Sequence, residues 1–142
     1  MSEFKRVLTI TDNKQSSINQ SCAAKKYFLR SISDNAKYKD FIIKDYRILN
    51  ILIFVLLKIK LIKLDKCLLD FKPDLVVTCG RVTAPFSVTL KKIFKCKNIH
   101  ILNPYISNSF FDLILIPNHD NFPNGKHIIK FNGALVDPDN YK

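Results

Sequence analysis

The fold of this chain is decided by a stretch that reads Pro73-Asp74-Leu75-Val76-Val77-Thr78-Cys79-Gly80-Arg81-Val82-Thr83-Ala84-Pro85. Its short run of leucine and valine is typical of a strand buried on both faces. Gly80 comes next and permits a backbone conformation that other residues resist. Thr83 and Pro85 then suit the cap and the first turn of a helix. A strand, a glycine and a helix start predict a βα loop at the carboxyl edge of a parallel sheet, where open α/β sheets bind ligands and where Arg81 supplies a cation.

Short apolar segments rich in β-branched residues recur on both sides of this stretch. Together they predict strands over residues 7–12, 41–43, 73–80, 98–102, 111–116 and 127–131. Helices are expected between the first four strands: from a cap at Ser16 or Ser17 to about Ser31, over 48–69, and over 83–94. This alternation predicts an α/β fold, a three-layer Rossmann-like domain whose mostly parallel sheet is covered on both faces. We expect the domain to occupy residues 1–136, followed by a polar tail at 137–142.

The composition is that of a globular protein with an unusual charge. Of 142 residues, 47% are hydrophobic and 25% are charged, a balance that argues against disorder. Lysine and arginine number 23 and aspartate and glutamate 12, so the net charge is +11. This charge indicates an anionic partner, such as a phosphate-bearing ligand or an anionic membrane surface, although a genome rich in A and T would produce the same excess of lysine. Lysine is spread through every segment, which argues against nucleic acid as the partner.

The cysteines and glycines argue against several kinds of site. The cysteines form no Cys-x-x-Cys pair and lie near no pair of histidines, so no metal site is expected at Cys22, Cys67, Cys79 or Cys96. Three glycines, without a Gly-x-Gly-x-x-Gly or Walker pattern, argue against a dinucleotide or P-loop site, and we expect no cofactor. The first residues lead into a strand without a secretory signal core, which predicts reduced thiols and a cytoplasmic location.

The most apolar part of the chain is the run Ile48–Leu57, which continues into a segment where apolar residues alternate with lysines. A membrane-spanning helix needs about 20 apolar residues, and Lys58, Lys60 and Lys63 interrupt the run too early for that. We therefore favour a buried crossover helix that runs to about Leu69. The alternative is an interfacial patch, in which the three lysines meet anionic headgroups and surplus apolar side chains enter the bilayer, placing the protein peripherally on the inner face of the membrane.

Polar residues follow several of the predicted strands and should gather at one edge of the sheet. They are Asp12, Gly80 with Arg81, Asn103, and His119 with Asp120. His119 is a candidate for acid–base chemistry because histidine titrates near neutral pH. Adjacent residues on an extended chain point apart, so Asp120 is not expected to orient His119. Of the other two histidines, His100 is expected to be structural and His127 to be exposed.

Four segments resemble the motifs of a known family, in the same order along the chain. Thr11–Gln20 is similar to Thr-Asp-Gly-Lys-x-Gly-His-x-x-Gln, and Pro73–Pro85 closely matches Pro-Asp-Leu-Val-Ile-x-x-Gly-Arg-x-x-Ala-Pro. Phe111–Asp120 is similar to Phe-Asp-Leu-Val-x-x-Pro-x-His-Asp, and Asn132–Leu135 looks like an Arg-Gly-Ala segment. The family is the mitochondrial-fission ELM family of plants with its bacterial relatives, which are described as glycosyltransferase-like.

The resemblance implies a GT-B-like architecture of two Rossmann-like domains, of which this chain corresponds to the N-terminal, acceptor-side half. It implies transfer of a sugar from a nucleotide-sugar donor to a lipid-linked or cell-envelope acceptor. With the C-terminal donor domain absent, nucleotide sugar or anionic acceptor would bind only with a second domain or a partner chain that supplies that half. The alternative is a non-catalytic protein of the membrane surface or an inactive remnant.

The resemblance also implies roles for individual residues. Arg81 would steady a phosphate or an anionic acceptor, and His119 or Asp120 would be the catalytic acid or base. The other residues expected to bind ligand are Asp12, Lys14, Gln20, Gly80, Thr83 and Asn103. The first loop departs from the family pattern, because Asn13, Ser16 and Ser17 stand where the family has Gly, Gly and His. These changes remove close backbone approach and one candidate base from that loop.

Overall fold

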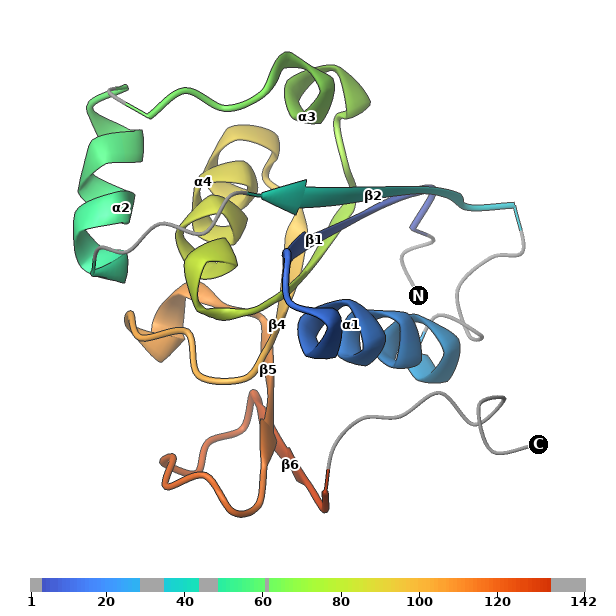
Figure 1. Cartoon of the computed structure of the whole chain (residues 1–142). Coiled ribbons are helices and arrows are strands. Elements are labelled where there is room, and N and C mark those ends of the chain that lie inside the picture. The colour runs from blue at the N-terminus through green and yellow to red at the C-terminus, as the bar shows by residue number, and fades with distance from the viewer. Residues whose placement is uncertain (1–3, 29–34, 44–48, 61, 134–142) are drawn as a thin grey trace.

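The computed structural model describes residues 4–28, 35–43, 49–60 and 62–133 of the chain (Figure 1). Strands and helices alternate along it, as the sequence predicts for an α/β protein. In chain order they are β1 (Arg6–Asp12), α1 (Gln15–Phe28), β2 (Lys37–Ile43), α2 (Asn50–Lys58), α3 (Lys66–Phe71), β3 (Leu75–Cys79), the 3₁₀ turn η2 (Arg81–Thr83), α4 (Ala84–Phe94), β4 (Lys97–Ile101), the 3₁₀ turn η3 (Asn108–Phe110), β5 (Leu113–Pro117) and β6 (Ile128–Phe131).

The strands form a six-stranded sheet in the order β2-β1-β3-β4-β5-β6, and each neighbouring pair is parallel. The prediction of a mostly parallel sheet is confirmed. From β1 the chain builds the sheet outward on one side through β2 and then on the other side through β3. The order therefore reverses between β1 and β3, and this topological switch point is where open α/β sheets form a ligand crevice at their carboxyl edge.

Both faces of the sheet carry apolar side chains, which explains why its strands appear in the sequence as continuous apolar runs. On one face Val7, Leu75 and Val77 pack with Ala24 of α1. On the other face the neighbouring strand residues pack against helices α2 and α4, for example through Val76. Figure 1 shows the same division, with α1 on one side of the strands and α2 and α4 on the other, so the fold has three layers.

The crossover between β2 and β3 differs from the single buried helix that the sequence predicts over 48–69. Helix α2 ends at Lys58, Lys60 has a positive φ of 63°, and α3 starts only at Lys66. The Asp65 side chain accepts a 2.8 Å hydrogen bond from the Cys67 amide and so caps a new helix. The prediction of one helix is wrong because a left-handed turn and a second cap interrupt the apolar run. Among the described helices, none is long and apolar enough to cross a bilayer.

Other boundaries shift for local reasons. Helix α1 begins at Gln15, so the prediction that Ser16 or Ser17 caps it is wrong, and both serines lie in its first turn. Strand β2 starts at Lys37 rather than at 41, because its whole length pairs with β1. The expected end of the first helix near Ser31 and the tail at 137–142 lie outside the described residues.

Candidate functional site

The centre of the candidate site is the contact between Asp12 and Gly80, at the carboxyl ends of β1 and β3. A side chain on residue 80 would place its Cβ 2.5 Å from Asp12 Oδ2, and Gly80 has a φ of +105°. Both the space and the backbone conformation therefore demand glycine here. Asp12 is 3% exposed, and its Oδ1 accepts a 3.1 Å hydrogen bond from the Lys14 amide at the start of α1. The Asp12 carboxyl thus bonds to the backbone of the loop after β1 and packs against the turn after β3.

Arg81 follows this glycine and is oriented by a buried asparagine. Its Nη1 donates a hydrogen bond of 3.3 Å to Oδ1 of Asn50, in the first turn of α2. The Asn50 Nδ2 donates to the carbonyl oxygens of Arg81, at 2.5 Å, and Pro104, at 2.6 Å. Asn50 is 2% exposed, so these bonds are shielded from water. They fix the loop after β3 and the loop after β4 to one helix.

Sequence reasoning missed Asn50, although a signal was present. Asn50 is the polar residue inside the apolar run Ile48–Leu57. A polar side chain in a segment predicted to be buried must find hydrogen-bond partners, so this position indicates a buried contact to backbone. The partners themselves, more than 30 residues away in the sequence, could not be predicted from the run.

Thr83 closes the turn after β3 instead of capping α4. Its Oγ1 donates a 2.7 Å hydrogen bond to the Gly80 carbonyl, and it is fully buried. Thr83 stands at the N-cap position of α4, as predicted, but its side chain makes no capping hydrogen bond to that helix. That part of the prediction is wrong. The Thr83 hydroxyl hydrogen is used within the loop, and a role in ligand binding stays a prediction.

The buried thiol beside this loop is not suited to nucleophilic chemistry. Burial raises the pKa of the Cys79 thiol to about 12, in spite of a hydrogen bond with the Ser17 side chain. A thiolate is the reactive form, so this cysteine is a protonated, packed side chain at neutral pH. Ser17 lies in the first turn of α1, where the resemblance places a histidine.

The remaining residues predicted near the first loops are spread over the same edge. Lys14 is exposed at the start of α1. Gln20 lies within α1, and its buried Oε1 has no hydrogen-bond partner among the described residues. Asn103 follows β4, where its Oδ1 accepts a 2.9 Å hydrogen bond from the Tyr105 amide. Their roles in binding stay predictions.

His119 and Asp120 lie in the turn after β5. The His119 Nε2 is 3.5 Å from Asp120 Oδ1, and the two side chains are 72% and 40% exposed. The expectation that Asp120 does not face His119 is wrong, because a turn in which the Asp120 amide bonds to the Pro117 carbonyl replaces the extended chain. Strand β4 separates β5 from β3, so this pair stands about two strand spacings, roughly 10 Å, across the sheet from the Gly80 loop.

The other histidines serve the packing. His100 is fully buried in β4, its Nδ1 lies 2.7 Å from Thr78 Oγ1, and burial lowers its pKa to about 3. Its predicted structural role is confirmed. His127 is half-buried rather than exposed as expected, because its Nε2 contacts the Asn108 carbonyl at 3.1 Å. Within the described residues, no group of three or more His, Cys, Asp or Glu side chains could hold a metal ion.

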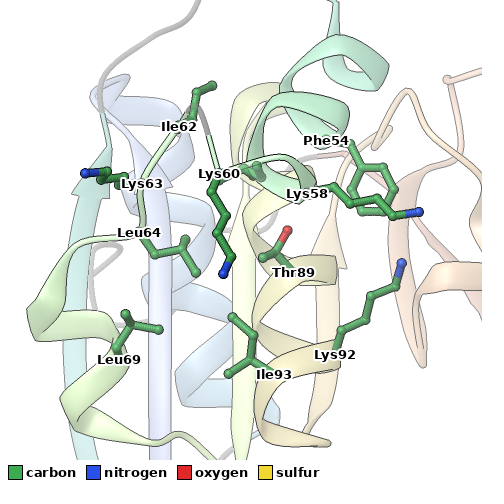
Figure 2. Close-up of a pocket in the computed structure, with 11 residues that line it drawn as sticks. Phe54, Lys58, Lys60, Ile62, Lys63, Leu64, Leu69, Thr89, Lys92 and Ile93 are labelled. Atoms are coloured by element: carbon green, nitrogen blue, oxygen red, sulfur yellow. The ribbon is translucent and has the colours of Figure 1, made fainter.

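A cavity of about 530 Å³ lies beside the C-terminal end of α2, and Lys58, Lys60 and Lys63 are among the residues that line it (Figure 2). The three lysines predicted to contact a membrane are thus grouped around one apolar hollow. Lys92 of α4 is a fourth lysine at its rim. Phe54 also lines the cavity.

Comparison with known proteins places these motifs in a family. The family model described as mitochondrial fission ELM1 matches residues 23–140, an interval that includes both the Gly80 loop and the His119 turn. A protein of Rickettsia prowazekii (strain Madrid E), named only as uncharacterized, is 41% identical over 49 residues, which are 34% of this chain and 14% of that relative's length. The chain thus covers only a small part of this relative. Because the family match extends over more than half of the residues, the chain belongs to the mitochondrial fission ELM1 family.

Proposed function

We propose that this chain binds the acceptor in a glycosyltransferase-like protein, and that an anionic group of the acceptor binds beside Arg81. The observation that carries the proposal is the Arg81 guanidinium, which Asn50 holds at the β1/β3 switch point directly after the Gly80 turn. Gly80 itself is buried beside the Asp12 carboxyl, so a ligand would contact the side chains around the turn rather than the Gly80 backbone. Guanidinium groups suit phosphate because they donate two parallel hydrogen bonds.

The electrostatics of the loop predict how such an acceptor would lie. The Asp12 carboxyl disfavours a phosphate directly over Gly80, so we expect the phosphate on the side of Arg81 and the exposed Lys14. The phosphate of a lipid-linked acceptor would therefore be bound by these two cations.

The transfer step would use a second domain or partner chain that binds the nucleotide sugar. In such a step the acceptor hydroxyl loses its proton to a base while its oxygen bonds to the anomeric carbon, and the bond from that carbon to the nucleotide phosphate breaks. His119 and Asp120 are the candidates for the base, since their 3.5 Å contact allows the carboxylate to orient the imidazole. Their distance from Gly80 across the sheet leaves room for a sugar between them.

Isothermal titration calorimetry with a short-chain prenyl phosphate and with a sugar phosphate tests the binding proposal. We expect Arg81→Ala to weaken binding about tenfold or more, since hydrogen bonds to charged groups are worth roughly 1.5–3 kcal/mol. Arg6→Ala is the matched control, because Arg6 begins β1 at the opposite edge of the sheet and pairs with Asp74. No measurable heat with either phosphate, or an equal loss in the two variants, would contradict the proposal.

A second candidate function is attachment to a membrane surface, with or without catalysis. It is favoured by the apolar side of α2 that the fold leaves exposed, with Ile51 at 55%. The two functions are compatible, because enzymes that act on lipid-linked acceptors work at a membrane.

A further inference from the structure

Helix α2 is apolar on both of its sides, and only one side is covered within the described part of the chain. Ile53 and Leu57 are buried against the sheet and α4. The opposite side carries side chains that are 44–57% exposed: Ile51, Leu52, Val55 and Ile59. Ile51, Val55 and the C-cap residue Ile59 follow one another at spacings of four residues, and Leu52 lies three residues before Val55, so the four side chains fall on one arc of the helix. We call this arc the outer side of α2.

A surface helix normally has a polar outer side, and one that is apolar all round is normally buried. Leu49, just before the helix, is 72% exposed and lengthens the apolar surface. Exposed apolar surface of this extent marks an interaction site in a soluble domain. We therefore expect a partner to bind the outer side of α2.

The charge beside this surface indicates the chemistry of that partner. Lys58 lies on the outer side itself, three residues after Val55. The adjoining cavity of about 530 Å³ is lined by Lys60, Lys63 and Lys92 as well, and no acidic side chain lines it. In Figure 2 the side chain of Lys60 points into the hollow, between Leu64 and Thr89.

One of these lysines stands over aromatic rings. The Lys92 ammonium lies 4.6 Å from the ring centre of Phe54 and 5.4 Å from that of Phe110. Much of the rest of the cavity lining is aliphatic, with Leu57, Leu64 and Ile93 among its residues. A basic rim over an apolar hollow fits an anionic amphiphile, whose headgroup meets the lysines while its chain meets the aliphatic lining.

We propose that the outer side of α2 and the basic cavity beside it form a surface that binds a bilayer containing anionic phospholipid. A second copy of the chain is a poor occupant, because it would bring another basic surface and a net charge of +11 against the same lysines. Nucleic acid would pair with the lysines but would leave the outer side of α2 uncovered. An anionic bilayer satisfies both features, because it accepts apolar side chains at its interface and phosphates lie directly above them.

Co-sedimentation of the full chain with vesicles tests the proposal. We expect binding to vesicles of phosphatidylcholine mixed with phosphatidylglycerol, little binding to phosphatidylcholine alone, and a loss as NaCl rises from about 0.1 M to roughly 0.5 M. Each lysine near an anionic surface contributes roughly fivefold, so Lys58→Glu with Lys60→Glu should weaken binding at least about 25-fold. Lys37→Glu with Lys126→Glu is the control, with the same change of charge on exposed residues outside α2 and the cavity.

A fluorescence experiment separates insertion of the helix from attraction of charge alone. The chain has no tryptophan, so Val55→Trp introduces a single reporter on the outer side of α2. We expect its emission to shift to the blue with anionic vesicles, and Ile51→Ser in the same protein to reduce the shift. Lys126→Trp, which places the reporter on an exposed residue outside α2, should show no shift in its emission.

Three results would overturn the proposal. Vesicle binding could be independent of anionic lipid and of salt, or the two double lysine variants could lose the same amount of vesicle binding. The chain could also form a concentration-dependent dimer in sedimentation velocity that Ile51→Ser abolishes. The proposal does not rest on sugar transfer. Arg81→Ala should leave vesicle binding unchanged, so failure at the Gly80 loop and failure at α2 are distinguishable.

Discussion

His100 should make the stability of this domain fall as the solution becomes mildly acidic. Its imidazole is fully buried, its Nδ1 contacts the Thr78 hydroxyl at 2.7 Å, and its Nε2 has no hydrogen-bond partner among the described residues. The ring also packs against Phe111, with 5.3 Å between ring centres. An imidazolium in this place would be a buried charge without a counter-ion, and burial accordingly lowers the pKa from 6.5 to about 3.

The sign and size of the effect follow from proton linkage. Between pH 6.5 and about pH 3 the unfolded chain protonates this histidine and the folded chain does not, so acid favours unfolding. The stabilisation is fully present above pH 6.5 and is lost by about 1.4 kcal/mol per pH unit within the window. At pH 5 the loss should be about 2 kcal/mol, and below pH 3 it should reach roughly 5 kcal/mol.

Urea unfolding followed by far-ultraviolet circular dichroism, at several values between about pH 7.5 and pH 5, measures this loss. His100→Gln is the comparison protein, because glutamine retains hydrogen-bonding capacity toward Thr78 and does not titrate. Its free energy of unfolding should vary with pH by about 2 kcal/mol less than that of the native protein over this range. An equal pH dependence in both proteins, or an NMR titration that places the His100 pKa near 6.5, would refute the reasoning.

Five further substitutions, of which Gly133→Ala and Ile51→Ala are controls, test the packing around the Gly80 loop and helix α2. Gly80→Ala should lower the free energy of unfolding in urea melts by about 2–4 kcal/mol. Gly133→Ala should lower it by only about 1 kcal/mol, because Gly133 also has a positive φ, of +73°, but has no atom within 4 Å of an added Cβ. Equal losses would show that the collision at Gly80 does not matter. Asn50→Leu should lower the free energy of unfolding by about 2–3 kcal/mol, because the Arg81 and Pro104 carbonyl groups lose their hydrogen-bond donor. A decrease of less than about 0.5 kcal/mol would argue against these buried hydrogen bonds. On α2, Ile53→Ala should lower the free energy of unfolding by about 2–4 kcal/mol, measured through the thermal midpoint. Ile51→Ala should change it by less than about 0.5 kcal/mol. Similar losses of stability in the two variants would mean that the outer side of α2 is covered.

Much of the candidate site was predictable because its chemistry is local in the sequence. A strand that ends in glycine, followed by Arg81, predicts a βα loop at the carboxyl edge, and the structure has that loop. The contact of Asp12 with Gly80 was not predictable. It depends on β1 and β3 being neighbours in register, with Thr11 opposite Cys79, and register is a property of the assembled sheet.

Two predictions fail because neighbouring segments change the conformation or the burial of a stretch of chain. On an extended chain His119 and Asp120 would point apart, but the turn after β5 brings them together. The apolar sequence around α2 predicts a buried helix, but a helix packed on one layer buries only one of its sides.

The sequence by itself determined the α/β class, the parallel sheet and the site of the Gly80 turn. These features follow from hydrophobic periodicity, from glycine and proline, and from the family motifs, all of which act within a few residues of chain. Only the tertiary structure decided that Asn50 ties two loops to α2, that Asp12 demands glycine at position 80, and that the described part of the chain leaves one side of α2 exposed. The physical reason is that burial and hydrogen-bond partnership depend on which segments meet in space, and residues 50, 81 and 104 meet only once the sheet and its helices are packed.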